Sequence, residues 1–178
     1  MGALIAFIRV IDVVNEVVGR VVAWLTFGTV AVCFLVVVLR YVFSIGFIWL
    51  QELYVWQHAV VFMLGAGYTF LHGGHVRVDI LYARMSPRRR ALVDLFGTFV
   101  FLLPWLGVVI YYGMPFLILS WRLLEPSSQS DGLPGFFLLK SVIPAFCVLV
   151  GLQGLAIAAR SALVLAGREE FAPAQSGH

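Results

Sequence analysis

Long runs of apolar residues, separated by short polar connections, dominate this chain. Four runs contain no charged residue, namely Val21–Leu39, Leu53–Leu71, Leu95–Trp121 and Ser141–Ala159. A helix of about nineteen residues is roughly 28 Å long, close to the thickness of the hydrocarbon layer of a bilayer. The pattern therefore predicts an all-α membrane protein with four transmembrane helices at about 21–39, 50–71, 91–121 and 139–160. They form a single domain over residues 1–160, and residues 161–178 form a tail.

The third apolar run is longer than a bilayer requires, so its helix should tilt or bend. Pro104 and Pro115 provide places for a bend, because a proline inside a helix removes a backbone hydrogen bond. Ser86 and Pro87 precede this run and fit the N-cap and the first residue of a helix.

The segment before the first span has a helical pattern of its own. Arg9, Asp12, Glu16 and Arg20 are spaced three or four residues apart, which places them on one stripe of a helix whose other positions are mostly apolar. We expect an amphipathic helix at about 3–20 that lies at the membrane interface and leads into the first span. An anchor in the lipid surface and a docking surface for another subunit both fit this pattern.

The composition agrees with a membrane protein. Of the 178 residues, 62% are hydrophobic and 12% are charged, whereas soluble domains carry roughly 25% charged residues. The mean hydropathy is +1.00. The net charge of +3 is concentrated in one loop, so nucleic acid is not an expected partner. Lipid headgroups suit this loop better, through Arg84, Arg88, Arg89 and Arg90.

The distribution of Lys and Arg predicts the orientation. The N-terminal segment has two, the loop between the second and third runs has five, and the end of the chain has two, which makes nine on one side. The two remaining connections have three. Because positive residues stay in the cytoplasm, both termini and the tail should be cytoplasmic. The loops around Ser44 and Ser127 should face outward from a bacterial inner membrane.

The apolar runs contain few groups that could do chemistry. His58 is the one ionisable residue well inside a run, and a second deep histidine for haem is missing. Cys33 and Cys147 lie far apart with no CxxC motif, so a redox protein is a weak alternative. An autonomous small homo-oligomeric transporter is also weakly supported, because proton coupling usually needs a carboxylate within a span.

A metal site is equally poorly supported. His72, His75 and Asp79 follow an HxxHxxxD spacing, but Gly73 and Gly74 interrupt the helix that would align them. We therefore expect no catalytic residue, metal or cofactor in this chain, and no enzyme activity.

Several short strings, in a fixed order from Arg40 to Arg160, carry a family resemblance. They are RYVF at Arg40–Phe43, WLQEL at Trp49–Leu53, GGHVRVDILYARMSPRRR at Gly73–Arg90, GLP at Gly132–Pro134, and LLKSVIP with LQGLA within Leu138–Ala156. With four predicted spans, the chain resembles the small membrane subunit, the DctQ-like component, of tripartite ATP-independent periplasmic (TRAP) transporters.

The resemblance implies a non-catalytic scaffold in a sodium-coupled symporter that imports a small organic acid or similar solute. In this family a larger, elevator-type membrane subunit holds the solute and sodium sites, and a periplasmic binding protein delivers the solute. Because the chain ends soon after its fourth predicted span, we expect the large subunit to be a separate polypeptide.

Particular residues then become candidates. The interface candidates are Arg40, Trp49, Glu52, His75, Arg77 and Asp79. Glu125 and Asp131, in the second outward loop, are candidates for docking the binding protein. Arg40 and Glu52 flank the first outward turn and are positioned to form an ion pair.

Overall fold

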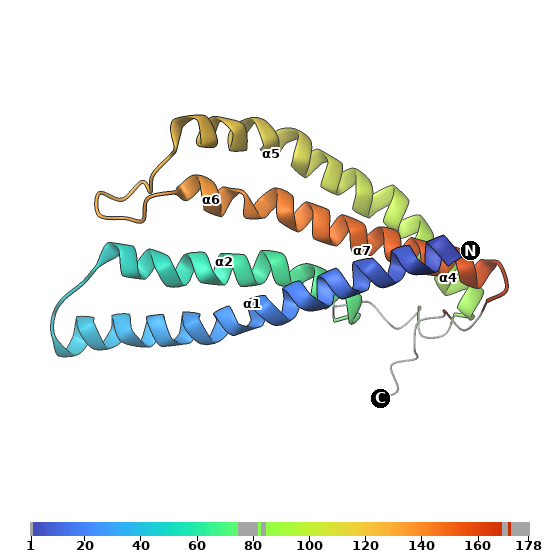
Figure 1. Cartoon of the computed structure of the whole chain (residues 1–178), viewed down its shortest axis with the longest axis horizontal. Helices are drawn as coiled ribbons and strands as arrows, with labels where there is room; N and C mark the ends of the chain where they lie inside the picture. Colours follow the sequence, from blue (N-terminus) through green and yellow to red (C-terminus); the bar gives the residue numbers. More distant parts are fainter. Residues whose placement is uncertain (1, 75–81, 83–84, 169–170, 172–178) are drawn as a thin grey trace.

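The computed structural model describes residues 2–74, 82, 85–168 and 171, and every regular element among them is helical. The all-α class is therefore confirmed for the described part of the chain. In Figure 1, α1 runs beside α2, and α7 runs beside the series formed by α4, η1 and α5. The elements are α1 (Gly2–Val42), α2 (Ile48–Leu71), α4 (Pro87–Phe96), the π-helix η1 (Gly97–Leu102), α5 (Leu103–Leu123), α6 (Phe136–Lys140) and α7 (Val142–Leu165).

The predicted amphipathic helix at 3–20 and the first predicted span at 21–39 form one continuous helix, α1. No proline interrupts residues 2–42, and Gly19 lies against the side chain of Tyr68 on α2. With 41 residues, α1 is roughly 60 Å long, about twice the hydrocarbon thickness. Its first part extends past the end of α2 and crosses α7 (Figure 1). The N-terminal segment is thus packed on helices of its own chain.

Small residues allow α1 and α2 to approach closely. Gly67 faces Asn15 so tightly that a Cβ atom on Gly67 would lie 2.1 Å from Asn15 Oδ1. Gly28 lies against Gln57, since a Cβ atom on Gly28 would be 3.5 Å from Gln57 Nε2. Such contacts between small residues are the usual basis of helix association in membranes, where lipid competes with apolar packing.

The third predicted span, 91–121, corresponds to the series α4, η1 and α5. Ser86 is the N-cap and Pro87 the first residue of α4, as predicted, although the Ser86 side chain makes no capping hydrogen bond. The π-helix η1 ends two residues before Pro104, where the Leu103 N–H bonds to Thr98 O, five residues back. This wider turn accommodates the proline ring, which would otherwise collide with the preceding turn. Pro115 lies inside α5 without ending the helix.

Helix α7 occupies the centre of the bundle and contacts α1, α2, α4 and α5. The fourth predicted span, 139–160, is divided by Ser141 into α6 and α7, and α7 continues to Leu165. Most of the buried residues of α7 are small or apolar. The full set is Cys147, Val150, Gly151, Gln153, Gly154, Ala156, Ala158, Ser161, Leu163 and Val164. Gly154 lies directly against Leu102 of η1.

Three helical segments in the described residues are long and apolar enough to cross a membrane: Gly2–Val42, Pro87–Leu123 and Phe136–Leu165. The second predicted span, 50–71, corresponds to α2, which has 24 residues and is not among these three segments. Polar residues lower its hydropathy, particularly Gln51, Glu52, Gln57 and His58.

Candidate functional site

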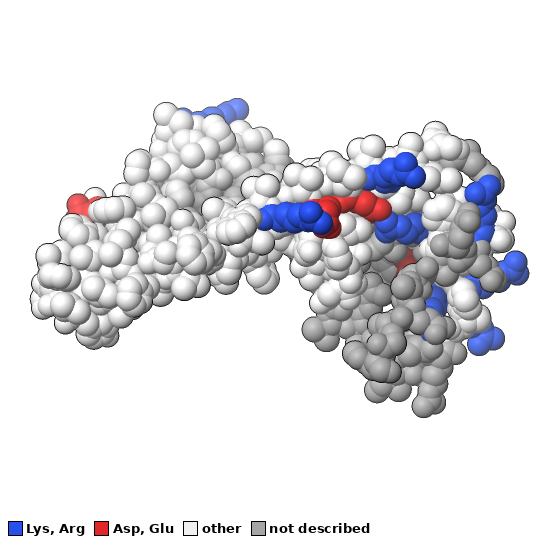
Figure 2. All heavy atoms as spheres, turned by 60° about the horizontal axis from the view of Figure 1, so that its bottom comes forward, with Lys and Arg blue, Asp and Glu red and all other residues white. Residues whose placement is uncertain are grey.

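The charged side chains are distributed unevenly along the bundle. Most of the Lys and Arg atoms visible in Figure 2 lie in the half of the molecule that contains the N-terminus and α4. Much of the remaining surface in this view is uncharged. Polar side chains also form two separate groups of contacts between helices and loops. After the membrane sides that the sequence predicts for them, we call them the inward cluster, near the N-terminal half of α1, and the outward cluster, around the loop between α5 and α6.

The inward cluster joins α1 to α7 through buried polar side chains. Asn15 is 1% exposed and Gln153 is 0% exposed. The Asn15 Nδ2 group donates to Gln153 Oε1 at 2.7 Å, and Gln153 Nε2 donates to Asp12 Oδ1 at 3.3 Å. Asp12 also forms an ion pair with Arg160. One connected network therefore holds the N-terminal half of α1 against the last helix.

A second set of contacts ties α1 to the end of α2. Glu16 accepts a hydrogen bond from Arg20 at 2.7 Å, one helical turn away. The other carboxylate oxygen of Glu16 lies 3.3 Å from His72 Nε2. His72 also stacks on Tyr68, with ring centroids 4.2 Å apart. The stripe predicted on α1 is therefore partly used for contacts within the chain.

The arginines at the start of α4 divide into two kinds. Arg88 and Arg89 are exposed, which suits the predicted contact with lipid headgroups. The Arg90 Nε–H group instead donates to the carbonyl oxygens of Tyr82 and Met85. The hydroxyl group of Tyr82 donates to Asp94 at 2.7 Å. Arg90 therefore supports the start of the helix, where a positive charge is otherwise unfavourable because of the helix dipole.

The outward cluster is centred on Glu52 of α2. One carboxylate oxygen accepts a hydrogen bond from Ser127 Oγ, and the other accepts from the Leu133 backbone N–H at 2.7 Å. Both partners belong to the loop between α5 and α6, 75 and 81 residues away in the sequence. Gly132 lies against both side chains, since a Cβ atom there would be 2.7 Å from Glu52 Oε2 and 2.5 Å from Ser127.

An ion pair closes the base of the same loop. Glu125 pairs with Lys140, which is buried. The Lys140 ammonium group also lies 3.7 Å from the centre of the Phe116 ring. The hydrogen bond from Lys140 holds the pKa of Glu125 below its ordinary value of 4.5. Beside this pair, Trp121 Nε1 donates to Ser141 Oγ at 2.9 Å. The negative charge of Glu125 is therefore largely compensated by Lys140, which weakens the expected role of Glu125 in docking the binding protein.

The remaining predicted residues have different surroundings. Arg40 is exposed, and no ion pair of Arg40 occurs among the described residues, so the predicted pairing with Glu52 is wrong. Glu52 turns toward the other outward loop instead. Trp49 is 43% exposed, and Asp131 is also exposed. The predicted residues outside the described part are His75, Arg77, Asp79 and Arg84.

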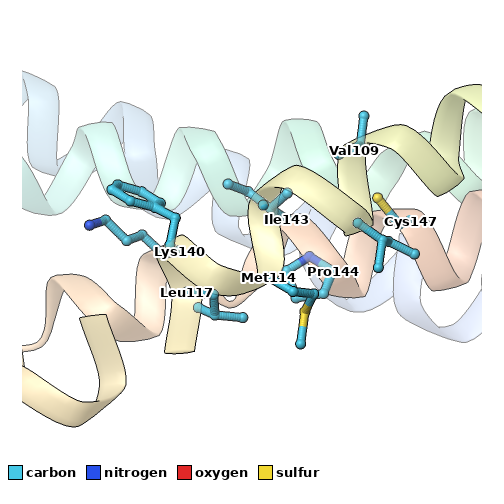
Figure 3. A pocket seen from close by; sticks show the side chains of 10 residues that line it. Val109, Met114, Leu117, Lys140, Ile143, Pro144 and Cys147 are labelled. Carbon is cyan, nitrogen blue, oxygen red and sulfur yellow. The ribbon is translucent and has the colours of Figure 1, made fainter. Parts of the chain in front are cut away.

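An apolar groove lies between α5 and the start of α7 (Figure 3). Its lining includes Val109, Met114, Leu117, Ile143, Pro144 and Cys147, with Lys140 at one end. The lining supplies packing surface and no group suited to catalysis, since the Lys140 ammonium is already paired with Glu125. Within the described residues, no group of three or more His, Cys, Asp or Glu side chains could hold a metal ion.

Two long helices present broad apolar faces. On α1 these exposed side chains include Trp24, Phe27, Val30 and Phe34, and on α5 they include Trp105, Tyr111, Tyr112 and Phe116. Faces of this kind require lipid or another membrane subunit as their environment.

These features define a helical membrane protein with an apolar body and polar contacts near its ends. The sequence model of one family, described as tripartite ATP-independent periplasmic transporters, DctQ component, matches residues 29–163. The chain therefore belongs to the DctQ family, and it is a membrane component of a transporter, not an enzyme. No curated protein and no solved structure matches the chain significantly.

Sequence reasoning overlooked three residues that organise the two clusters. Asn15 lies beside the predicted charged stripe and has no distinctive spacing of its own. Ser127 lies in a loop where polar residues are ordinary, and the partner at Leu133 is a backbone group. One weak signal was available, because Gln153 is an uncharged amide within an otherwise apolar helical segment.

Proposed function

We propose that this chain is the static scaffold subunit of a sodium-coupled TRAP transporter that imports a small organic acid or similar solute. It braces a separate, larger elevator-type subunit, which holds the solute and sodium sites. Membership of the DctQ family implies a large membrane subunit and a binding protein as partners. The scaffold role, the coupling ion and the solute class are parts of the proposal.

The observation that carries the scaffold role is the contrast between the surface and the interior of the bundle. Aromatic side chains such as Phe27 on α1 and Tyr112 on α5 are exposed along helices of membrane-spanning length. In contrast, α7 is largely buried and is held by the polar network that includes Gln153. A fixed core with apolar outer faces suits a subunit that another membrane protein packs against.

We further propose four spans in a bacterial inner membrane, with both termini in the cytoplasm. The 24 residues of α2 give about 36 Å of helix, which is sufficient to cross the hydrocarbon layer. The arrangement of Lys and Arg supports this orientation. Single cysteines at Ser130 and Gly167, in a variant that lacks the native Cys33 and Cys147, test it in spheroplasts. An impermeant maleimide should label the cysteine at 130 only; labelling of both or of 167 alone would contradict the topology.

The outward loops are proposed to help dock the binding protein, through Ser44–Trp49 and Leu124–Phe137. Asp131 is the better candidate of the two predicted acids, because it is exposed whereas Glu125 is paired. Asp131→Lys should weaken binding-protein affinity several-fold, as expected for a charge at the rim of an interface. Arg89→Glu, a charge reversal of equal size in the proposed cytoplasmic loop, is the matched control. Equal affinities for both variants would count against docking at this loop.

Reconstitution into liposomes tests the scaffold role. The large subunit, this chain and the binding protein are combined, and solute uptake is measured with and without a sodium gradient. We expect uptake with all three proteins, little without this chain, and none with this chain alone. Uptake by this chain alone would instead favour an autonomous transporter.

A further inference from the structure

The loop between α5 and α6 is long, yet it has a defined shape. It begins after Leu123 and ends before Phe136, and it contains no regular helix or strand. Leu124 starts it in the left-handed region, with a φ of 46°. Inside the loop, the Ser127 N–H donates to Leu133 O at 3.2 Å, which brings its two flanks together. A loop of this length without its own secondary structure commonly has a functional role.

The main side-chain support for this shape comes from a different helix. The Glu52 carboxylate on α2 bonds the Ser127 hydroxyl with one oxygen and the Leu133 N–H with the other. A single side chain therefore holds both flanks of the loop at once. Ser127 Oγ also accepts from the Gln129 N–H at 3.2 Å, which extends the support toward the tip.

The contacts of Glu52 leave one exposed polar segment, Ser128–Asp131, which we call the loop tip. All four of its residues are exposed. Because Glu52 is turned into the loop and Glu125 is paired with Lys140, Asp131 is the one carboxylate in the loop without a described partner. A polar, weakly charged and preformed surface is typical of a transient contact with a soluble protein.

We propose that Glu52 is a positioning residue that holds the loop tip in the conformation that receives the soluble binding protein. This inference rests on the docking role proposed above, and it adds the residue that preorganises the docking surface. Glu52 need not touch the binding protein, because it acts through the shape of the loop. Preorganisation raises affinity by removing the cost of ordering the loop during binding.

The geometry predicts a graded series of variants. Glu52→Ala removes both acceptors and leaves the Leu133 N–H without its partner. Glu52→Gln should retain most of the support, because its oxygen can accept from Leu133 and its amide can donate to the Ser127 hydroxyl, which can act as acceptor. Gln51→Ala is the matched control, since Gln51 neighbours Glu52 on α2 and no side-chain hydrogen bond of Gln51 occurs in the described structure.

The experiment uses the complex of this chain with its large subunit in nanodiscs. A spin label on a cysteine at position 130, with the native Cys33 and Cys147 replaced, reports the mobility of the loop tip. Affinity for the system's own binding protein is measured on the same samples. Glu52→Ala should increase label mobility and weaken affinity about tenfold, whereas Glu52→Gln and Gln51→Ala should stay within about threefold of the parent.

Two results would overturn the proposal, in distinguishable ways. Unchanged mobility in Glu52→Ala would show that Glu52 does not position the loop, even if the loop docks the binding protein. Increased mobility with unchanged affinity would show that docking does not use this loop, so the docking role itself would fail. If Glu52→Ala does not assemble, Ser127→Ala and Gly132→Ala test the same contacts, because the first removes a partner and the second adds a Cβ atom against it.

Discussion

The hydrogen bond between Asn15 and Gln153 offers a direct test of how α1 is held against α7. Their side chains meet at 2.7 Å although the residues are 138 apart in the sequence. Both side chains are almost completely buried. Replacing either by alanine leaves the other amide without its main partner in a site that water does not reach easily.

The expected magnitude follows from measured costs of similar changes. A buried polar group left without a partner costs about 1–3 kcal/mol, and coupling between hydrogen-bonded side chains in membrane proteins averages about 0.6 kcal/mol, with a maximum near 1.7 kcal/mol. Asn15 Oδ1 has no hydrogen-bond partner in the structure, so Asn15 contributes mainly through its Nδ2 group. We therefore expect Asn15→Ala and Gln153→Ala each to cost about 1–2 kcal/mol, with a coupling energy of about 1 kcal/mol.

The assay is a double-mutant cycle on the purified protein in mixed micelles. Unfolding by added sodium dodecyl sulfate is followed by tryptophan fluorescence, after reversibility has been established. The control cycle pairs Asn15→Ala with Thr29→Ala, because the Thr29 hydroxyl bonds only the Leu25 carbonyl within α1. Its two effects should add within about 0.5 kcal/mol. A coupling energy for Asn15 and Gln153 that is indistinguishable from this control would show that their hydrogen bond does not hold α1 against α7.

Two further predictions concern other contacts. Gly67→Ala should destabilise the protein by about 1–3 kcal/mol, because its Cβ atom would lie 2.1 Å from Asn15 Oδ1. Gly65→Ala is the control and should be nearly neutral, because the atom nearest to its Cβ position is 3.9 Å away. Similar thermal midpoints for the two variants would contradict this packing. The lowered pKa of Glu125 means that its pair with Lys140 stabilises the fold fully above about pH 4.5 and loses this effect as the pH falls through the lower folded value. Melting curves between pH 7 and pH 3 should therefore show an acid-dependent loss of stability that is smaller in Glu125→Gln, and an identical loss in both proteins would contradict it.

The sequence predicted the helical class and the approximate position of each helix, because long apolar runs leave few alternatives in a membrane. It also predicted the start of α4 at Ser86 and Pro87 and a perturbation near Pro104, where the π-helix η1 ends two residues earlier. These features depend on residues that are close in the sequence, and local backbone chemistry is enough to anticipate them.

The organisation of the two polar clusters could not be predicted in the same way. The pairing of Glu52 with Arg40 was the natural local expectation, since the two residues flank one turn. In the fold, the α5–α6 loop comes closer to Glu52 and offers a hydroxyl and a backbone N–H. Likewise, the N-terminal half of α1 packs on α7 through Gln153 and Arg160, which supply the partners of Asn15 and Asp12. Such contacts are decided by how the helices pack.

We propose that this chain is a scaffold which works only together with a larger membrane subunit. Purification of the chain from native membranes in mild detergent, followed by identification of the proteins that accompany it, tests this most directly. We expect a larger, polytopic membrane protein in a fixed ratio to this chain. Recovery of the chain alone, stable and monodisperse, would contradict it.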